Sequence, residues 1–161
     1  QLQKTLTYVG YGKEEGAELV AGGGRISDGA FADGYFVQPT VFAGVSNSMR
    51  IAREEIFGPV AALIPFDGEE EAVAIANDTS YGLTAGLWSQ DIGKAHRVAA
   101  KIRAGMVWVN TYRFIRWTTP YGGFKASGWG RENGIEALDS YLETRTTVVS
   151  TTARFPDAYA S

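Results

Sequence analysis

Apolar residues recur along this chain with two different periods, and the changes of period predict an order of helices and strands. Near the N-terminus, Leu2, Leu6 and Val9 follow spacings of four and three, which indicate one apolar helical face. Residues 17–20 then form a short apolar run that is typical of a strand, and three consecutive glycines end it at 22–24. The sequence therefore predicts a helix followed by a strand.

The next segment is less regular and predicts loops with extended chain. Residues 25–34 are rich in Gly and Asp without periodicity, so we expect a loop there. Residues 35–42 look extended, although Pro39 excludes a position in the middle of a hydrogen-bonded ladder. A short helix is expected over 48–54.

A regular alternation of strand and helix patterns begins at residue 58. Apolar runs predict three strands, over 60–66, 83–88 and 106–109. Two helices separate them: Asp67 caps the first, with Glu70 at the spacing of a capping box, and Asp91 caps the second. Gly105 is expected to end the second helix in the left-handed conformation. Because each crossover is long enough to return the chain in parallel, we predict an α/β fold with a mostly parallel sheet and crossover helices.

The last third changes character. Residues 111–130 are irregular and dense in Gly and aromatic residues, which predicts a long loop. We expect a helix over 133–142 and a strand over 143–152, where Thr and Val predominate. The small, polar tail at 153–161 is expected to fray.

Composition narrows the class of protein. A chain of 161 residues with a net charge of −3 is one compact domain or a piece of one, and it is a poor non-specific nucleic-acid binder. No apolar run approaches the roughly 20 residues of a membrane-spanning helix, and no signal peptide is visible, so we expect a cytoplasmic protein. The first residue is Gln1 rather than Met, which predicts a processed or truncated polypeptide.

The absence of one residue type restricts the chemistry. The chain contains no cysteine, which excludes disulfides, cysteine-ligated zinc and any mechanism in which this chain supplies a thiolate. The single histidine, His96, lies in a predicted helix without a second ligand of its kind. We therefore predict no metal site and no catalytic nucleophile in this chain.

A first cluster of candidate residues precedes the strand at 60–66. Glu54 and Glu55 are followed by Phe57 and by a Gly-Pro pair at the start of the apolar run. A carboxylate can accept hydrogen bonds from both hydroxyls of a ribose while an apolar ring covers the base, so the cluster suits a nucleoside. The same residues are also typical of a solvated helix end with a phenylalanine in the core.

A second cluster is aromatic. Six aromatic residues lie between Trp108 and Phe124, about three times the average density of the chain. Aromatics on a loop after a strand commonly line an apolar pocket, and Arg113 and Arg116 in this loop could pair with an anionic substrate group. Ordinary packing under a long loop explains the aromatics equally, whereas the acidic net charge disfavours an RNA-stacking surface.

Glycine patterns do not add a phosphate site. The segments 10–16 and 128–134 lack the G-x-G-x-x-G spacing, and neither clearly follows a strand and opens a helix. The glycine run at 22–24 is expected to be a turn.

Four longer motifs occur in a fixed order and are more specific. They are 54–60 (EEIFGPV), Asn77 with 81–83 (YGL), 105–110 (GMVWVN) and 120–132 (PYGGFKASGWGRE). This succession closely resembles the C-terminal part of the NAD(P)-dependent aldehyde dehydrogenases, from the first helix to about Val149. The resemblance implies a partial aldehyde-dehydrogenase-like catalytic domain.

The resemblance also implies roles for single residues. Glu55 corresponds to a glutamate that holds the nicotinamide ribose, and Phe57 to a phenylalanine beside the nicotinamide ring. Tyr121 corresponds to an aromatic wall of the aldehyde channel, and Arg113 to Ile115 to its variable entrance. Gly122 and Gly123 correspond to spacers that allow close backbone approach. Glu132 corresponds to a glutamate near a proton or water route.

The same resemblance implies a division of the chain. Residues 1–140 correspond to the C-terminal half of the catalytic domain, 141–152 to an oligomerisation strand and 153–161 to a flexible tail. The alternating segment Thr144 to Val149 would extend a sheet in a neighbouring subunit, which implies a homo-oligomer. An upstream half of the enzyme would be the other partner, with no nucleic acid and no membrane.

In the family, a cysteine thiolate attacks the aldehyde, hydride passes to NAD(P)+, and water activated by a glutamate releases the acid. The cysteine, that glutamate, the oxyanion-hole asparagine and the cofactor domain lie upstream in family members. We therefore expect a fragment of an aldehyde dehydrogenase that uses NAD or NADP, inactive when isolated. The alternative is a non-enzymatic binding or assembly module that retains the fold, and the choice of aldehyde is open.

Overall fold

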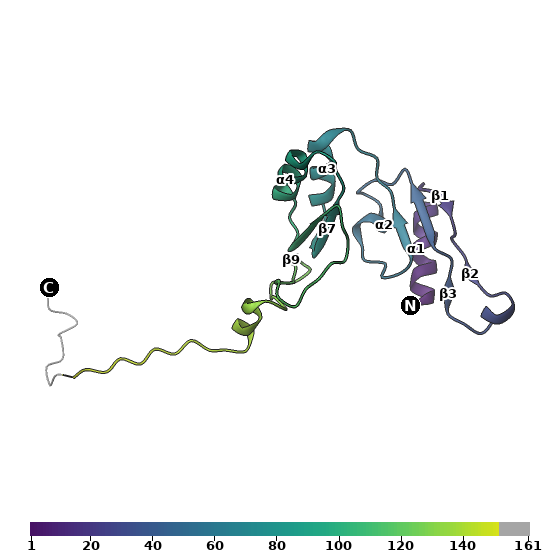
Figure 1. Ribbon diagram of the computed structural model, residues 1–161. Coiled ribbons are helices and arrows are strands. Elements are labelled where there is room, and N and C mark those ends of the chain that lie inside the picture. The colour runs from purple at the N-terminus through teal and green to yellow at the C-terminus, as the bar shows by residue number, and fades with distance from the viewer. Residues whose placement is uncertain (152–161) are drawn as a thin grey trace.

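The computed structural model describes residues 1–151, which form two lobes followed by an extended C-terminal segment (Figure 1). The first lobe comprises residues 1–66 and the second comprises residues 67–141. The tail predicted at 153–161 lies outside the described residues.

The first lobe is a helix packed on a three-stranded sheet. Helix α1 (Leu2–Glu14) lies against the sheet, in which β4 (Thr40–Ala43) is the central strand between β1 (Glu18–Ala21) and β5 (Val60–Ala62). Strand β1 runs antiparallel to β4, and β5 runs parallel to it. The remaining elements are β2 (Arg25–Ile26), the short 3-10 helix η1 (Gly29–Phe31), β3 (Phe36–Val37) and α2 (Arg50–Arg53).

The core of this lobe surrounds Phe42, whose side chain is completely buried. Val9 from α1 and Ile51 from α2 belong to the same buried cluster. The glycine at position 12 allows the helix to approach the ring, because a Cβ atom there would lie 2.9 Å from the Phe42 Cζ atom. The predicted apolar face of the first helix is thus confirmed at Val9.

The second lobe repeats the strand–helix–strand pattern. Strand β7 (Thr84–Leu87) leads through α4 (Ile92–Lys101) to β8 (Met106–Val109), which pairs with it in parallel. Helix α3 (Gly68–Asn77) lies beside α4 (Figure 1). The remaining elements are β6 (Tyr81–Gly82), its antiparallel partner β9 (Phe124–Lys125) and the 3-10 helix η2 (Ile135–Ser140).

The predicted α/β class is confirmed, with a mixed set of strand pairings. Crossovers return the chain in parallel at β4–β5 and at β7–β8. The pairs β1–β4, β2–β3 and β6–β9 are antiparallel, so the sheets are less parallel than the sequence predicted. The two parallel pairs are each joined by a connection that contains a helix, α2 for β4–β5 and α4 for β7–β8.

The N-terminal caps of α3 and α4 were both predicted from the sequence, with different outcomes. The Asp91 carboxylate accepts a hydrogen bond from the Lys94 N–H, at 2.9 Å, so this predicted cap is confirmed. The capping box predicted for α3 is wrong, because the Asp67 side chain makes no capping hydrogen bond and the Asp67 N–H donates to the Glu71 carboxylate and not to Glu70.

The prediction for Gly105 is wrong. Gly105 is not among the residues with positive φ, and Ile102 ends α4 in an extended conformation. Glycine is needed there for space, because a Cβ atom would lie 1.7 Å from the Gly122 carbonyl oxygen. Two backbone segments therefore meet at this point, and the conformational freedom of glycine is not what the site uses.

Two predicted elements have a different form near the C-terminus. The helix expected at 133–142 is the 3-10 helix η2, and the strand expected at 143–152 shows no strand pairing through residue 151. The side chains of this segment are exposed, including Val148 and Val149. Figure 1 shows it extending away from the second lobe.

One apolar surface is larger than the sequence suggested. The run 60–66 was expected to be covered on both faces, but β5 ends at Ala62 and Phe66 is 62 % exposed. Trp88 and Ile92 are exposed as well. None of the helices within residues 1–151 combines the length and the apolar character needed to cross a membrane.

An ion pair joins α1 to α2. The Glu15 carboxylate accepts from the Arg50 Nε at 3.0 Å and from the Arg50 N–H at 2.7 Å, and the Arg50 guanidinium lies 3.7 Å from the centre of the Tyr11 ring. The hydrogen bonds from Arg50 hold the pKa of the Glu15 carboxyl below its usual value. This contact fixes the start of α2, which leads into residues 54–59.

The close approach of the Gly105 and Gly122 backbones predicts that alanine is destabilising at Gly105. At Gly10, which has no close neighbour, alanine should be stabilising. Gly105→Ala should lower the free energy of unfolding by several kcal/mol, about 2 or more, because the backbone must shift. Gly10→Ala, in the interior of α1 with nothing within 4 Å of the new Cβ, should raise it by about 0.5–1 kcal/mol. Urea denaturation measures both, and equal effects would contradict the contact.

The Glu15–Arg50 pair predicts a pH dependence. Since the pKa of Glu15 is lowered in the folded state, its stabilisation is present above the unfolded pKa and is lost as the pH falls through the folded one. Glu15→Gln should therefore lower the urea midpoint at pH 7, and the difference from the unchanged chain should shrink as the pH falls through the folded pKa of Glu15. Glu14→Gln, the exposed neighbour, is the control, and a difference that does not shrink at low pH would argue against the ion pair.

Candidate functional site

The first candidate site is the loop that joins α2 to β5. Ile56 in this loop is buried in the core of the first lobe, while Glu55 and Phe57 on either side of it are exposed. The Phe57 ring is 76 % exposed. The interpretation of this phenylalanine as a core residue is therefore wrong, because the neighbouring Ile56 occupies the core instead.

Phe57 has an unusual backbone conformation. Its φ is +55°, which costs a bulky residue about 1–2 kcal/mol relative to ordinary helical or extended geometry. Arg113 is in the same region, with φ +58°. Unfavourable backbone geometry at bulky, exposed side chains is typical of functional sites, and the sequence gives no direct sign of it.

The two glutamates before Phe57 differ in their contacts. The Glu54 carboxylate accepts a 2.6 Å hydrogen bond from the Tyr8 hydroxyl, which raises the pKa of Tyr8. Within residues 1–151 the Glu55 carboxylate has no hydrogen bond and no ion pair. Of the pair, Glu55 is therefore the carboxylate that is free to receive two hydroxyl donors from a ligand.

Two residues at the start of α1 hold this loop through its backbone carbonyls. The Gln1 side-chain amide donates to the Ile56 carbonyl at 2.8 Å and to the Phe57 carbonyl at 2.7 Å, and Lys4 Nζ donates to the Glu55 carbonyl at 2.9 Å. Sequence reasoning missed Gln1 and Lys4, because they lie 51 to 56 residues from their partners and carry no local pattern.

Phe57 also lines a hollow, which we call the Phe57 hollow. Its volume is about 330 Å³, and α1, β3 and the loop before β5 surround it. Its lining residues are Gln1, Leu2, Thr5, Tyr35, Phe36, Val37, Phe57, Gly58 and Pro59. Glu55 is not among these lining residues, so the exposed ring and the unpaired carboxylate share the loop while Phe57 alone of the two lines the hollow.

The second candidate site lies in the other lobe. Tyr121 and Glu132 form an isolated antiparallel bridge, in which each N–H donates to the other's carbonyl at 2.7 Å. Both residues line a hollow of about 520 Å³, the Tyr121 hollow, together with Trp129 and Tyr141. The structure therefore brings Tyr121 and Glu132 together, which the sequence could not show.

Glycines and one arginine shape this second hollow. A Cβ atom at Gly122 would lie 2.2 Å from the Gly130 carbonyl oxygen, so the expected close backbone approach is present. Arg131 Nη1 donates to the carbonyls of Gly123 at 3.0 Å and Gly130 at 2.8 Å. Arg131 thus closes the loop that carries Glu132, and it was not identified from the sequence.

Arg113 and Ile115 lie on an exposed loop rather than in either hollow. The Arg113 guanidinium lies 5.7 Å from the centre of the Tyr112 ring. Trp108 is buried, and its indole N–H donates to the Phe114 carbonyl at 2.9 Å, which anchors the loop. Of the aromatic cluster at 108–124, Tyr121 lines the Tyr121 hollow, whereas Trp117 is 83 % exposed.

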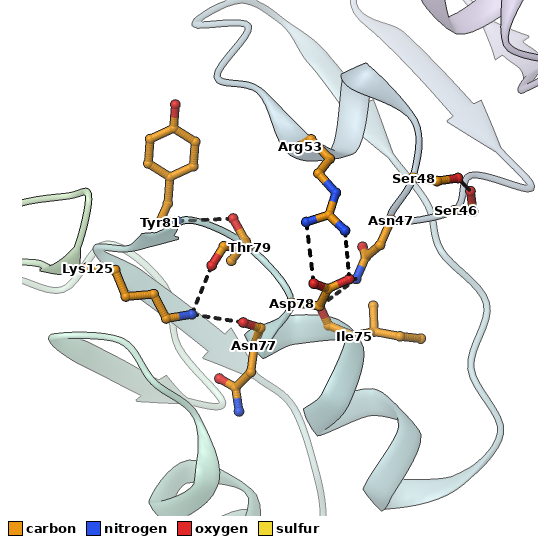
Figure 2. A network of polar contacts seen from close by, with 10 residues as sticks. All are labelled: Ser46, Asn47, Ser48, Arg53, Ile75, Asn77, Asp78, Thr79, Tyr81 and Lys125. Carbon is orange, nitrogen blue, oxygen red and sulfur yellow. Dashed lines mark hydrogen bonds and ion pairs between the residues drawn. The ribbon is translucent and has the colours of Figure 1, made fainter.

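A polar network connects the two lobes (Figure 2). The Asp78 carboxylate, just after α3, accepts from Arg53 Nη2 at 3.1 Å and from the Asn47 amide at 3.2 Å. Lys125 Nζ donates to the carbonyls of Asn77 and Thr79, which ties β9 to the same turn. Within residues 1–151, the Glu55–Phe57 loop and the Tyr121 hollow remain on separate lobes and form no common pocket.

The described residues contain no group of three or more His, Cys, Asp or Glu side chains that could hold a metal ion. His96 is exposed on α4.

Comparisons with known proteins agree with these motifs. The model of the family described as "Aldehyde dehydrogenase family" matches residues 1–147. The betaine aldehyde dehydrogenase of Mesorhizobium japonicum is 49 % identical over 151 residues, which are 94 % of this chain and 31 % of that protein. The chain thus spans about a third of the length of this relative.

Solved structures give the same result. A mutant betaine aldehyde dehydrogenase from Staphylococcus aureus in complex with NAD+ is 40 % identical with a TM-score of 0.94, covering 99 % of this chain and 32 % of that chain. An indole-3-acetaldehyde dehydrogenase of P. syringae in complex with NAD+ and IAA is 49 % identical with a TM-score of 0.86, covering 91 % and 29 %.

The hydrogen bonds from Gln1 to the Glu55–Phe57 loop predict that the loop becomes more mobile when they are removed. Gln1→Ala removes both hydrogen bonds to the loop carbonyls, so amide exchange over residues 55–58 should become several-fold faster. Gln3→Ala, an exposed glutamine of the same helix, is the matched control. Hydrogen–deuterium exchange with mass spectrometry measures this, and equal exchange in the two variants would refute the clamp.

Proposed function

Because this chain is a member of the aldehyde dehydrogenase family, we propose that it forms part of an enzyme that oxidises an aldehyde to a carboxylic acid. The reaction is RCHO + NAD+ + H₂O → RCOO⁻ + NADH + 2 H⁺. The single observation that carries the proposal is the free carboxylate of Glu55 next to the exposed ring of Phe57 on a restrained loop.

The cofactor side of the site uses the first lobe. Glu55 accepts the two hydroxyls of the nicotinamide ribose, and the Phe57 ring packs beside the heterocycle. Gln1 and Lys4 keep the loop in place through its carbonyls. NAD+ supplies the hydride acceptor when it is bound, and the NAD+ complexes of the Staphylococcus aureus and P. syringae relatives support NAD rather than NADP.

The substrate side uses the second lobe. Tyr121 forms a wall of the aldehyde channel, Arg113 and Ile115 border its entrance, and Glu132 lies near a route for protons or water. The bridge between Tyr121 and Glu132 supports this proposal because it fixes the two residues relative to each other.

This chain has no cysteine, so the nucleophile comes from residues outside it. We propose that the remaining part of the enzyme packs against the exposed apolar surface around Phe66 and Trp88. The segment Thr144 to Val149 adds to a sheet edge of a neighbouring subunit, which makes the enzyme a homo-oligomer.

A hybrid enzyme tests the proposed function. The aligned third of the Staphylococcus aureus betaine aldehyde dehydrogenase is replaced by this chain, and NADH formation from butanal is measured by absorbance. The hybrid should be active, whereas the isolated 161-residue chain should form no NADH because it lacks the thiol. Activity of the isolated chain would refute the proposal.

The neighbouring residues Glu54 and Glu55 provide a matched pair of variants that tests cofactor binding. Glu55→Gln should raise the KM for NAD+ by about tenfold, because it removes charge-assisted hydrogen bonds to the ribose. Glu54→Gln should leave that KM within about twofold, because Glu54 binds Tyr8 instead. An unchanged KM in the Glu55→Gln hybrid would contradict the role of Glu55 in holding the ribose, whereas a folded hybrid that forms no NADH would favour the non-enzymatic assembly module.

A further inference from the structure

The entrance segment, residues 111–119, carries two arginines that the fold leaves without an acidic partner. The Arg113 guanidinium lies over the Tyr112 ring, and the Arg116 guanidinium lies 4.8 Å from the centre of the Phe114 ring. Among residues 1–151, neither side chain is part of an ion pair. Their positive charge is therefore available to a ligand.

The sequence that immediately precedes and forms this segment provides no acidic residue, and the next acidic residues along the chain are Glu132 and Glu136. Residues 92–131 contain eight of the 15 basic residues of the chain and none of its 18 acidic residues. Most other basic side chains in this stretch have partners elsewhere: Arg97 and Lys101 pair with Glu69, while Lys125 and Arg131 donate to backbone carbonyls. A net-acidic protein thus keeps a basic segment at this one place.

The entrance segment is held in position rather than loose. Besides the Trp108 hydrogen bond to Phe114, the Thr119 N–H and hydroxyl donate to the Arg116 carbonyl, at 3.1 and 3.0 Å. The Gly134 N–H donates to the Trp117 carbonyl at 2.9 Å, which joins the segment to the chain that lines the Tyr121 hollow. The positive φ of Arg113 is a further sign that its side chain has a use.

We propose, resting on the proposed function, that Arg113 and Arg116 make this entrance selective for aldehydes that carry a carboxylate. Guanidinium groups bind carboxylates through paired, charge-assisted hydrogen bonds. A quaternary ammonium aldehyde binds poorly at this entrance for two reasons. The positively charged arginines repel it. The Tyr112 and Phe114 rings, which could bind it, are already in contact with guanidinium ions. This chain thereby differs from what its betaine aldehyde dehydrogenase relatives are named for.

The hybrid enzyme described above tests this selectivity with three probes: succinic semialdehyde, butanal and betaine aldehyde. In Arg113→Gln/Arg116→Gln, kcat/KM should fall about tenfold for succinic semialdehyde and rise for betaine aldehyde. It should stay within about twofold for butanal, which carries no charge. High salt should reduce the difference between probes, because the arginines are exposed.

Lys13→Gln is the control, since it removes a positive charge from α1, in the other lobe. Equal losses for butanal and succinic semialdehyde in the arginine variant, or the same selectivity change in the lysine control, would overturn the proposal. Turnover of butanal with no preference among the probes overturns only the selectivity. No turnover of butanal by a folded hybrid overturns the proposed function itself.

A smaller graft covers the case in which the hybrid does not fold. Only residues 111–119 are transferred into the Staphylococcus aureus enzyme at the aligned positions. The ratio of kcat/KM for succinic semialdehyde to that for betaine aldehyde should rise about tenfold. An unchanged ratio in this active graft would also overturn the selectivity.

Discussion

The hydrogen bonds at Asp78 are the constraint on which the arrangement of the molecule depends. One carboxylate at the end of α3 binds Arg53 and Asn47 of the first lobe (Figure 2). Arg53 directly precedes the glutamates of the candidate cofactor loop, and the turn after α3 also receives Lys125 from β9. The proposed cofactor and substrate residues are therefore positioned relative to each other through a single turn.

Local patterns predicted the elements whose stabilising contacts are themselves local. Helix α4 begins at Asp91 because a carboxylate and an N–H three residues apart satisfy each other, and such a cap is visible in any sequence. The capping box predicted at Asp67 and Glu70 is absent, because the Asp67 side chain forms no cap and Glu71, one of three consecutive glutamates, accepts from the Asp67 N–H. The β6–β9 pair could not be predicted, since more than 40 residues separate its two strands.

The candidate site residues also differ in whether local sequence or distant contacts determine them. Glu55 and Phe57 are close in sequence, and motif resemblance was enough to select them. The difference between Glu54 and Glu55 depends on Tyr8, 46 residues away from Glu54, and the support of the loop depends on Gln1. The left-handed backbone of Phe57 and Arg113 left no trace in the sequence, because it arises from the packing around the loops.

The close approach of Gly105 to Gly122, and of Gly122 to Gly130, has a consequence for how this protein can diverge. Three backbone segments meet there, and a Cβ atom at Gly105 or at Gly122 would overlap a backbone carbonyl oxygen, so these two positions are confined to glycine unless the backbone moves. Substrate range can then change at the neighbouring loop residues, while the crossing point is inherited intact. Within about 25 residues of chain, the glycines therefore preserve the fold while the loop between them can change the substrate specificity.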